Sequence, residues 1–336
     1  MSRRVLLMMI ALVLLTGTAG AVGEERTPSA LTIRFENDLF ADTDRYYTNG
    51  ISIAWARPGM PGRPARWLWG PLGAERWFGG RVSHISEVGQ VIATPQDTDL
   101  VNPDPDDRPY AAILYMASAL HFEQESRVDV VKLIAGVLGP AALGEEAQNF
   151  AHRLFGLDEA QGWDYQLGNE PVLNLAWERR YRVRVAHAPD GWGADLLGTG
   201  GAMLGNMLTQ AQAGMQFRFG YRLPDDFGYT LIRGAGNIPP TCQCWGEGRR
   251  DDGRLGVQFF FGMSGNLVAR NVTLDGNTFR DSRSVEKEPF FAGAEAGVAL
   301  IYRRYQLGYA YVIWGREFEN QSDNSGFGSL FLSVGF

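Results

Sequence analysis

Apolar and polar residues alternate along much of the chain with a period of two, most clearly at its C-terminus. Between Ser329 and Phe336 the even positions hold Leu, Leu, Val and Phe, while the odd positions are mostly small or polar. A period of two predicts a β-strand with one apolar face. Where that face meets lipid and the other lines a lumen, the pattern is that of a transmembrane β-strand.

Similar segments recur along the chain, first at residues 31–36 and 51–56. Further candidate strands begin near Arg81, Pro109, Arg127, Pro171, Gly191, Gln210, Gly256, Pro289 and Tyr305, and the last near Phe327. A bilayer tolerates no open sheet edge, so twelve such segments must close on themselves. We therefore predict an all-β fold, a twelve-stranded antiparallel transmembrane β-barrel. A soluble β-sandwich would give similar alternation and is the alternative.

Residues 144–156 break this rhythm. Four residues there fall at i, i+3, i+4 and i+7, which is a helical stripe; they are Ala147, Phe150, Ala151 and Leu154. Gly156 is a suitable stop. Gln148 and His152 are four residues apart and share another face of such a helix. We predict a short helix on an extracellular loop between two strands.

The N-terminus has the features of a secretory signal peptide. Arg3 and Arg4 precede an apolar run over residues 5–15, and Ala19-Gly-Ala21 follows as a small-residue cleavage site. A permanent anchor helix is the alternative, but the run is short and no basic stop follows it. We expect cleavage to remove residues 1–21 and to leave residues 22–336 as one outer-membrane barrel domain.

Composition and charge narrow the function. The 45% hydrophobic and 12% aromatic content exclude a disordered chain. Loss of the two N-terminal arginines takes the net charge from −7 to about −9. Nucleic acid is therefore not an expected partner, because its binding needs a basic face. Cys242 and Cys244 lie one residue apart, and either a strained disulfide or two free thiols remains open.

One of the four histidines is a candidate for catalysis. His84, His121 and His187 have no distinctive neighbours, whereas His152 lies on the predicted helix beside Gln148 and six residues before Asp158. A general-base histidine needs a partner that fixes its tautomer, and an acidic side chain can do that. A structural or solvated histidine is the alternative.

A second candidate is the acidic end of the first strand. Glu36-Asn37-Asp38 lies there, with Asp42 and Asp44 nearby. Oxygen-rich side chains suit a hard cation such as calcium, but Asn and Asp are equally usual in hairpin turns, and the residues alone favour the turn. No serine nucleophile elbow, zinc-protease motif or phosphate-binding loop occurs.

Taken in order, several short motifs resemble those of the lipid A 3′-O-deacylase family of outer-membrane β-barrels. The matching motifs are Glu36-Asn-Asp38, Tyr47-Thr-Asn-Gly50, Asp107-Arg-Pro-Tyr-Ala111, Glu146-Ala-Gln-Asn-Phe-Ala-His-Arg153, Gly162-Trp163 with Gln166, and Leu274-Asp-Gly-Asn-Thr278. The similarity covers almost the whole chain beyond the signal peptide.

The resemblance implies a site between the barrel wall and a helix on an extracellular loop. It implies removal of the 3′-acyloxyacyl group from the lipid A of lipopolysaccharide in the bacterial outer membrane, with calcium. Carried over, Asn37 and Asp38 match the metal site and Thr48 a hydroxyl residue of the second strand. Gln148 and His152 match the helix pair, and Asp158 an acidic residue that holds the histidine.

One departure concerns substrate binding. The family pattern has a functional lysine before the Asp-Arg motif, where this chain reads Asp104-Pro-Asp-Asp107. Arg108 is then the candidate for the missing positive charge.

We expect a monomer surrounded by outer-membrane lipids. The alternatives are another outer-membrane lipid esterase, such as a phospholipase, and a non-catalytic pore or structural barrel.

Overall fold

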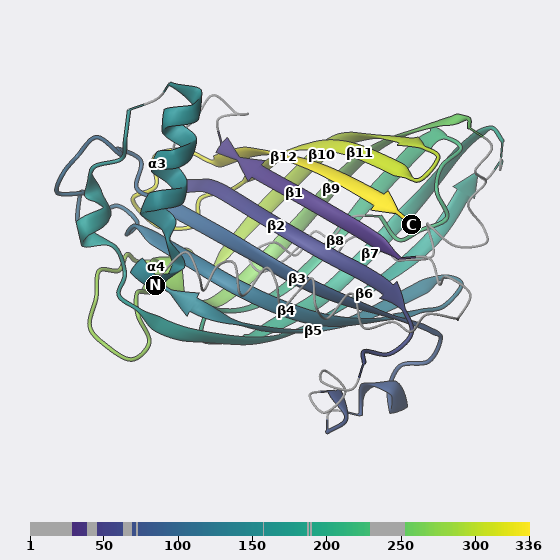
Figure 1. Ribbon diagram of the computed structural model, residues 1–336, viewed down its shortest axis with the longest axis horizontal. Coiled ribbons are helices and arrows are strands. Elements are labelled where there is room, and N and C mark those ends of the chain that lie inside the picture. Colours follow the sequence, from purple (N-terminus) through teal and green to yellow (C-terminus); the bar gives the residue numbers. More distant parts are fainter. Residues whose placement is uncertain are drawn as a thin grey trace.

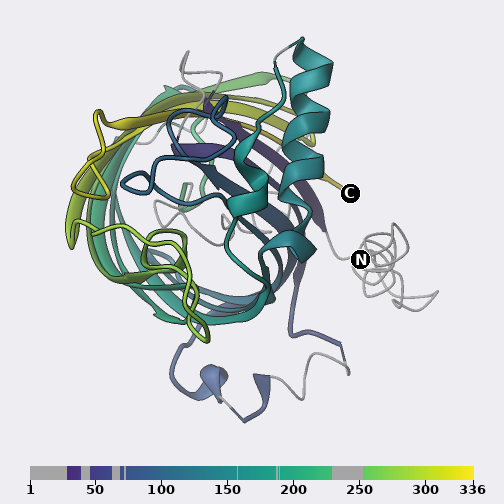
Figure 2. The same cartoon turned by 90° about the vertical axis from the view of Figure 1, so that its left-hand side faces the viewer.

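A computed structural model describes residues 29–38, 46–62, 69–71, 73–156, 158–186, 188, 190–228 and 253–336. Over these residues twelve antiparallel strands form a closed barrel in which β1 pairs with β12 (Figures 1 and 2). The predicted barrel is thus confirmed. The predicted signal peptide, both cysteines and His187 lie outside the described residues.

The strands begin close to the positions expected from the alternation. They are β1 (Ala30–Asn37), β2 (Tyr46–Pro58), β3 (Arg81–Thr94), β4 (Ala111–Glu123), β5 (Arg127–Leu138), β6 (Glu170–Ala186), β7 (Trp192–Gly205), β8 (Leu208–Tyr221), β9 (Leu255–Asn271), β10 (Phe290–Tyr302), β11 (Tyr305–Trp314) and β12 (Ser325–Gly335). Consecutive strands pair with each other all round the barrel, so each connection simply joins neighbours at one end.

The period-two pattern separates a lipid-facing surface from a polar lumen. In β12, Leu330 and Leu332 are exposed on the outside, whereas Ser329 and Ser333 are buried. The Ser333 hydroxyl is hydrogen-bonded to the hydroxyl of Thr32 in β1, 2.7 Å away, across the strand pair that closes the barrel. No helix in the described part of the chain is long and apolar enough to cross a membrane.

The two ends of the barrel differ. The end where β1 begins and β12 ends is called the terminal rim, and it also bears the short helix η2 (Ala74–Arg76). The opposite end is called the α3 rim, because the connection between β5 and β6 there contains α3 (Gly144–Phe155) between η3 (Pro140–Ala142) and η4 (Gly162–Tyr165). The predicted loop helix is confirmed. A second short helix at this rim, α4 (Val272–Asp275), follows β9.

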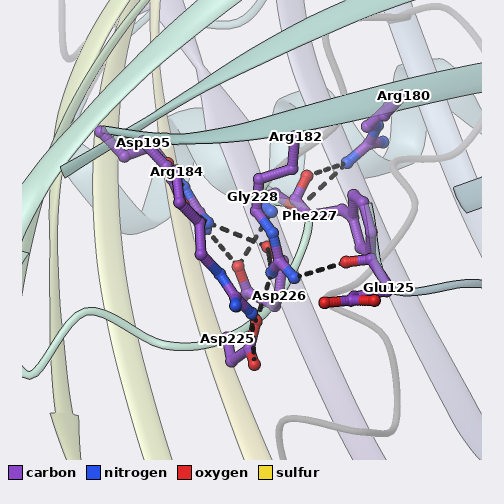
Figure 3. A network of polar contacts seen from close by, with 10 residues as sticks. Glu125, Arg180, Arg182, Arg184, Asp195, Asp225, Asp226, Phe227 and Gly228 are labelled. Atoms are coloured by element: carbon purple, nitrogen blue, oxygen red, sulfur yellow. Dashed lines mark hydrogen bonds and ion pairs between the residues drawn. The ribbon is translucent and has the colours of Figure 1, made fainter. Parts of the chain in front are cut away.

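The segment that follows β8 is held inside the barrel at the terminal rim by a network of polar contacts (Figure 3). Arg180 donates to the carbonyl oxygens of Phe227 and Gly228, at 2.9 and 3.1 Å. Phe227 is buried in one cluster with small inward-facing residues of β1 to β5, among them Ala54 and Ala119. Phe227 therefore packs in the interior of the barrel, in a cluster that also contains Leu197 of β7.

Ion pairs fix this segment in place. Arg218 donates to both carboxylate oxygens of Asp195, at 2.8 and 2.6 Å, and also pairs with Asp226. Gly228 has a φ of 62°, and a Cβ atom there would lie 2.4 Å from the amide oxygen of Gln216. Glycine is therefore the residue that allows this close turn inside the barrel.

Candidate active site beneath α3

Helix α3 lies outside the ring of strands, against the outer wall at the α3 rim (Figures 1 and 2). Its anchor is Gln90 of β3, which pairs in register with the lipid-facing Ile51 and so points outward. The Gln90 amide donates to the carbonyl oxygens of Ala142 and Leu143, at 2.6 and 3.1 Å. At the start of α3, a Cβ on Gly144 would lie 2.3 Å from that of Ala112, so the helix approaches β4 as closely as glycine permits.

The buried face of α3 bears uncharged polar side chains and His152, whereas its acidic residues are exposed. Gln148 and His152 are 1% and 4% exposed, whereas Phe150 is 64% exposed. A surface helix ordinarily turns its apolar stripe inward. Burial of polar groups costs free energy unless they are hydrogen-bonded, so the burial of Gln148 and His152 needs another reason to persist. A functional site between helix and wall is such a reason.

The main chain of Asp158 orients the His152 ring. The Nδ1 atom of His152 lies 2.5 Å from the carbonyl oxygen of Asp158. A carbonyl can only accept, so Nδ1 carries the proton and Nε2 presents its lone pair. The carboxylate of Asp158 is exposed, and the contact to the ring comes from its backbone. The sequence suggested that the Asp158 carboxylate would hold the His152 ring, whereas in the structure the backbone carbonyl of Asp158 does so.

One polar atom of the Gln148 amide is hydrogen-bonded within the protein and the other is not. Its Oε1 atom accepts a hydrogen bond from the indole nitrogen of Trp163 at 2.8 Å. Its Nε2 atom is buried and has no hydrogen-bond partner among the described residues. A buried donor without a protein partner is uncommon in folded proteins, and this one can bind a water molecule or a substrate group.

The end of β1 reaches the same outer wall. Asn37 lies on the face of β1 that also bears the exposed Ile33, and it pairs in register with Asn49 of β2. Asn49 in turn pairs with Ile92 of β3, which packs in the cluster of Trp163. Asn37 and its neighbour Asp38 are both buried. Thr48 lies in β2 at the irregularity between Tyr47 and Asn49, and its side chain is outside the described residues.

The residues at the end of β1 are of the types that coordinate calcium in proteins. Asn37 offers an amide oxygen and Asp38 a carboxylate, both hard ligands of the type that calcium prefers. Among the described residues, no group of three or more His, Cys, Asp or Glu side chains is placed to hold a metal ion. Asp42 and Asp44 lie outside the described residues.

Arg108 lies apart from this cluster. It is buried, and its guanidinium donates to the hydroxyl of Thr273 at 2.9 Å and pairs with Glu317 at 3.4 Å. It thereby joins three connections of the α3 rim. Burial raises the pKa of Glu317, and the Arg108 guanidinium opposes that shift. Burial likewise raises the pKa of Asp107, although two backbone N–H groups bind its carboxylate.

Neither lysine of the chain replaces the absent family lysine. Lys132 lies in the lumen, where it pairs with Glu87 at 2.6 Å, and Lys287 pairs with Asp275 at 2.7 Å. The structure therefore brings together Gln148, His152 and the main chain of Asp158, but gives Arg108 and the lysines contacts elsewhere.

Two further residues belong to the site although the sequence assigned them no role. Trp163 appeared only as part of a short motif, and Gln90 as one polar position in an alternating strand. Gln90 could have been singled out from the sequence, because the alternation places this polar residue on the lipid-facing side of its strand. No sequence pattern indicated that Trp163 would contact Gln148.

A closed barrel with an apolar outer surface and a polar cluster between its wall and a surface helix defines an outer-membrane β-barrel protein with an external site. The family profile described as "Outer membrane protein LpxR" matches residues 6–336, and the chain belongs to this family. The resemblance to the lipid A 3′-O-deacylase family and the outer-membrane location are thereby confirmed.

Two solved structures are similar to this chain to different degrees. LpxR from Salmonella typhimurium is 18% identical, with a TM-score of 0.72 over 91% of this chain and 99% of that chain. The β-domain of the Bordetella autotransporter BrkA is 11% identical, with a TM-score of 0.43 over 92% of this chain and 98% of that one. No curated protein sequence matches the chain.

Proposed function

We propose that this protein is a calcium-dependent ester hydrolase that removes the 3′-linked acyloxyacyl group from lipid A. Membership of the LpxR family supports an activity in the outer membrane. The observation that carries the proposal is the burial of Gln148 and His152 between α3 and the barrel wall, while the apolar Phe150 faces outward.

His152 is the general base of the proposed reaction. With Nδ1 held by the Asp158 carbonyl, Nε2 takes a proton from a water molecule, whose oxygen attacks the ester carbonyl carbon. The ester C–O bond then breaks, and the proton passes to the departing oxygen. The products are a hydroxyl on lipid A and a free acyloxyacyl acid. Because water is the nucleophile, no serine is required.

The developing charge falls on the carbonyl oxygen. The Nε2 group of Gln148 is a buried donor that can bind this oxygen as it becomes an oxyanion. Asn37 and Asp38 would hold the calcium ion, which when bound polarises the carbonyl as a Lewis acid.

The position of the site fits a lipid substrate. A cluster on the outer wall can be reached from the bilayer without passage through the lumen, in which Phe227 and its neighbours pack. Lipopolysaccharide occupies the outer leaflet, so the proposal places the α3 rim at the cell surface, where the longer loops of such barrels lie. The exposed ring of Phe150 would then face the acyl region.

Outer-membrane vesicles that contain wild-type protein, His152→Ala or His84→Gln test the proposal. The control residue His84 also lies on the outer wall, where its Nε2 contacts the Ser118 hydroxyl at 2.8 Å. Mass spectra of lipid A should lose the 3′-acyloxyacyl mass with wild type and His84→Gln, but match the empty vector with His152→Ala. Full deacylation by His152→Ala would refute its role. Cleavage of phospholipids with intact lipid A would instead indicate another lipid esterase.

A further inference from the structure

We infer that Trp163 is a positioning residue, which sets the orientation of the Gln148 amide for the reaction. The inference rests on the proposed function. A glutamine side chain has two orientations that differ by exchange of its oxygen and nitrogen, and only one of them directs N–H groups at a given point. The site therefore needs a group that distinguishes the two.

The indole of Trp163 is such a group. An indole nitrogen can donate but not accept. Its 2.8 Å contact therefore holds the oxygen of Gln148 on the Trp163 side and directs Nε2 away from it. The reversed amide would bring two donors together and leave the buried indole N–H without an acceptor. The observed partnerless Nε2 is the donor that this arrangement reserves.

Trp163 itself has little room to move. Its ring centroid lies 4.9 Å from that of Tyr110, and a Cβ on Gly144 would lie 2.6 Å from its Cη2 atom. A Cβ on Gly162 would likewise lie 2.5 Å from the ring of Tyr110. The main chain beyond η4 is tied to the same loop, because the N–H of Leu167 donates to the carbonyl of Tyr110 at 2.9 Å. Glycines at two positions thus permit a close fit that holds the indole in one orientation.

Trp163→Phe keeps an aromatic ring but removes the indole N–H donor together with part of the ring volume, so the effect of lost packing must be measured on a second buried indole. With purified lipopolysaccharide in micelles, we expect kcat to fall about twofold with KM unchanged, since the amide then divides between two orientations of which only one is productive. Gln148→Leu should lose about a hundredfold, as expected for removal of an oxyanion donor. Gln148→Glu should lose as much, although it still accepts from Trp163.

Trp69→Phe is the matched control. Trp69 is also a buried indole on the outer wall, and its N–H donates to the Ser118 hydroxyl at 3.0 Å. Its replacement should leave kcat and KM unchanged. The double variant of Trp163→Phe with Gln148→Leu should be no slower than Gln148→Leu alone, because the indole acts only through the amide.

A readout independent of activity completes the test. In protein labelled with ¹⁵N at glutamine side chains, Trp163→Phe should shift the NMR resonance of the Gln148 amide, and Trp69→Phe should not. An unchanged resonance, or an unchanged kcat, would overturn the positioning role. Absence of hydrolysis by the wild type would refute the proposed function, whereas the resonance would still decide the orientation of Gln148.

Discussion

Replacement of Arg218 by glutamine tests how the network at the terminal rim holds the barrel together. The Arg218 side chain is 0% exposed, and its partners Asp195 and Asp226 are 5% and 2% exposed. Glutamine is shorter and uncharged, so both carboxylates would stay buried without their cation. The loss of one partner from a buried ion pair costs about 3–5 kcal/mol, because a charge is left without compensation. We expect the free energy of unfolding to fall by that amount.

An exposed pair in the same network provides the control. Arg184 donates to both oxygens of Asp225, at 2.7 and 2.8 Å, but the two side chains are 42% and 59% exposed. Arg184→Gln should therefore cost less than about 1 kcal/mol. Denaturant unfolding in detergent micelles, followed by tryptophan fluorescence, measures both variants.

Neutralising the buried group as a whole gives a further check. Combining Arg218→Gln with Asp195→Asn and Asp226→Asn removes all three charges, so most of the lost stability should return. Equal effects of Arg218→Gln and Arg184→Gln, or no recovery in the triple variant, would refute this account of the network.

Three other outcomes are expected. The wild-type protein should give no steady channel openings in planar bilayers, because Phe227 and its neighbours pack inside the barrel at the terminal rim; stable conductance would contradict this. Chelation of calcium should abolish deacylation, and Asp38→Asn should raise the calcium concentration that restores it; equal activity in chelator would count against a metal at Asp38. The pKa values of Asp107 and Glu317 are raised above 3.8 and 4.5, so their stabilising effect is present below those values and lost as the pH rises through the raised ones. Hydrogen exchange of their loops, corrected for intrinsic rates, should therefore be slower in acid than at neutral pH, and the opposite trend would show that these carboxyls do not govern the loops.

The strands could be predicted because the bilayer imposes a strict pattern on them. Lipid requires apolar side chains at every second position, as in Leu330 and Leu332, and forbids an open edge. The helix over residues 144–155 was predictable for a similar reason, since its residue types and the stop at Gly156 depend on local geometry. Gly156 indeed has a φ of 72°.

The arrangement of the site depends on contacts between distant segments, which periodicity does not encode. The helical stripe that contains Phe150 did not reveal that this residue faces outward, because the polar face of α3 packs on a wall whose own residue there is Gln90. The sequence indicated an acidic partner for His152, but the ring contacts a backbone carbonyl, which any residue at position 158 could supply.

Arg108 illustrates the same point. A positive charge beside an acidic turn suggested substrate binding, yet its buried contacts are to Thr273 and Glu317, more than a hundred residues away in the chain.

The segment that packs inside the barrel at the terminal rim could not be anticipated either. Its residues Asp225 to Gly228 resemble an ordinary turn, and only the inward-facing arginines of β6 and β8 give them their place.

The mass of lipid A from cells that express this protein tests the central claim most directly, namely that the cluster beneath α3 hydrolyses an ester of lipid A. Extracts from cells with the wild-type gene should lack the mass of one acyloxyacyl group relative to cells with an empty vector, and the released acid should appear in the medium or membrane fraction. Unchanged lipid A, from cells in which the barrel is folded and resident in the outer membrane with calcium present, would contradict the account.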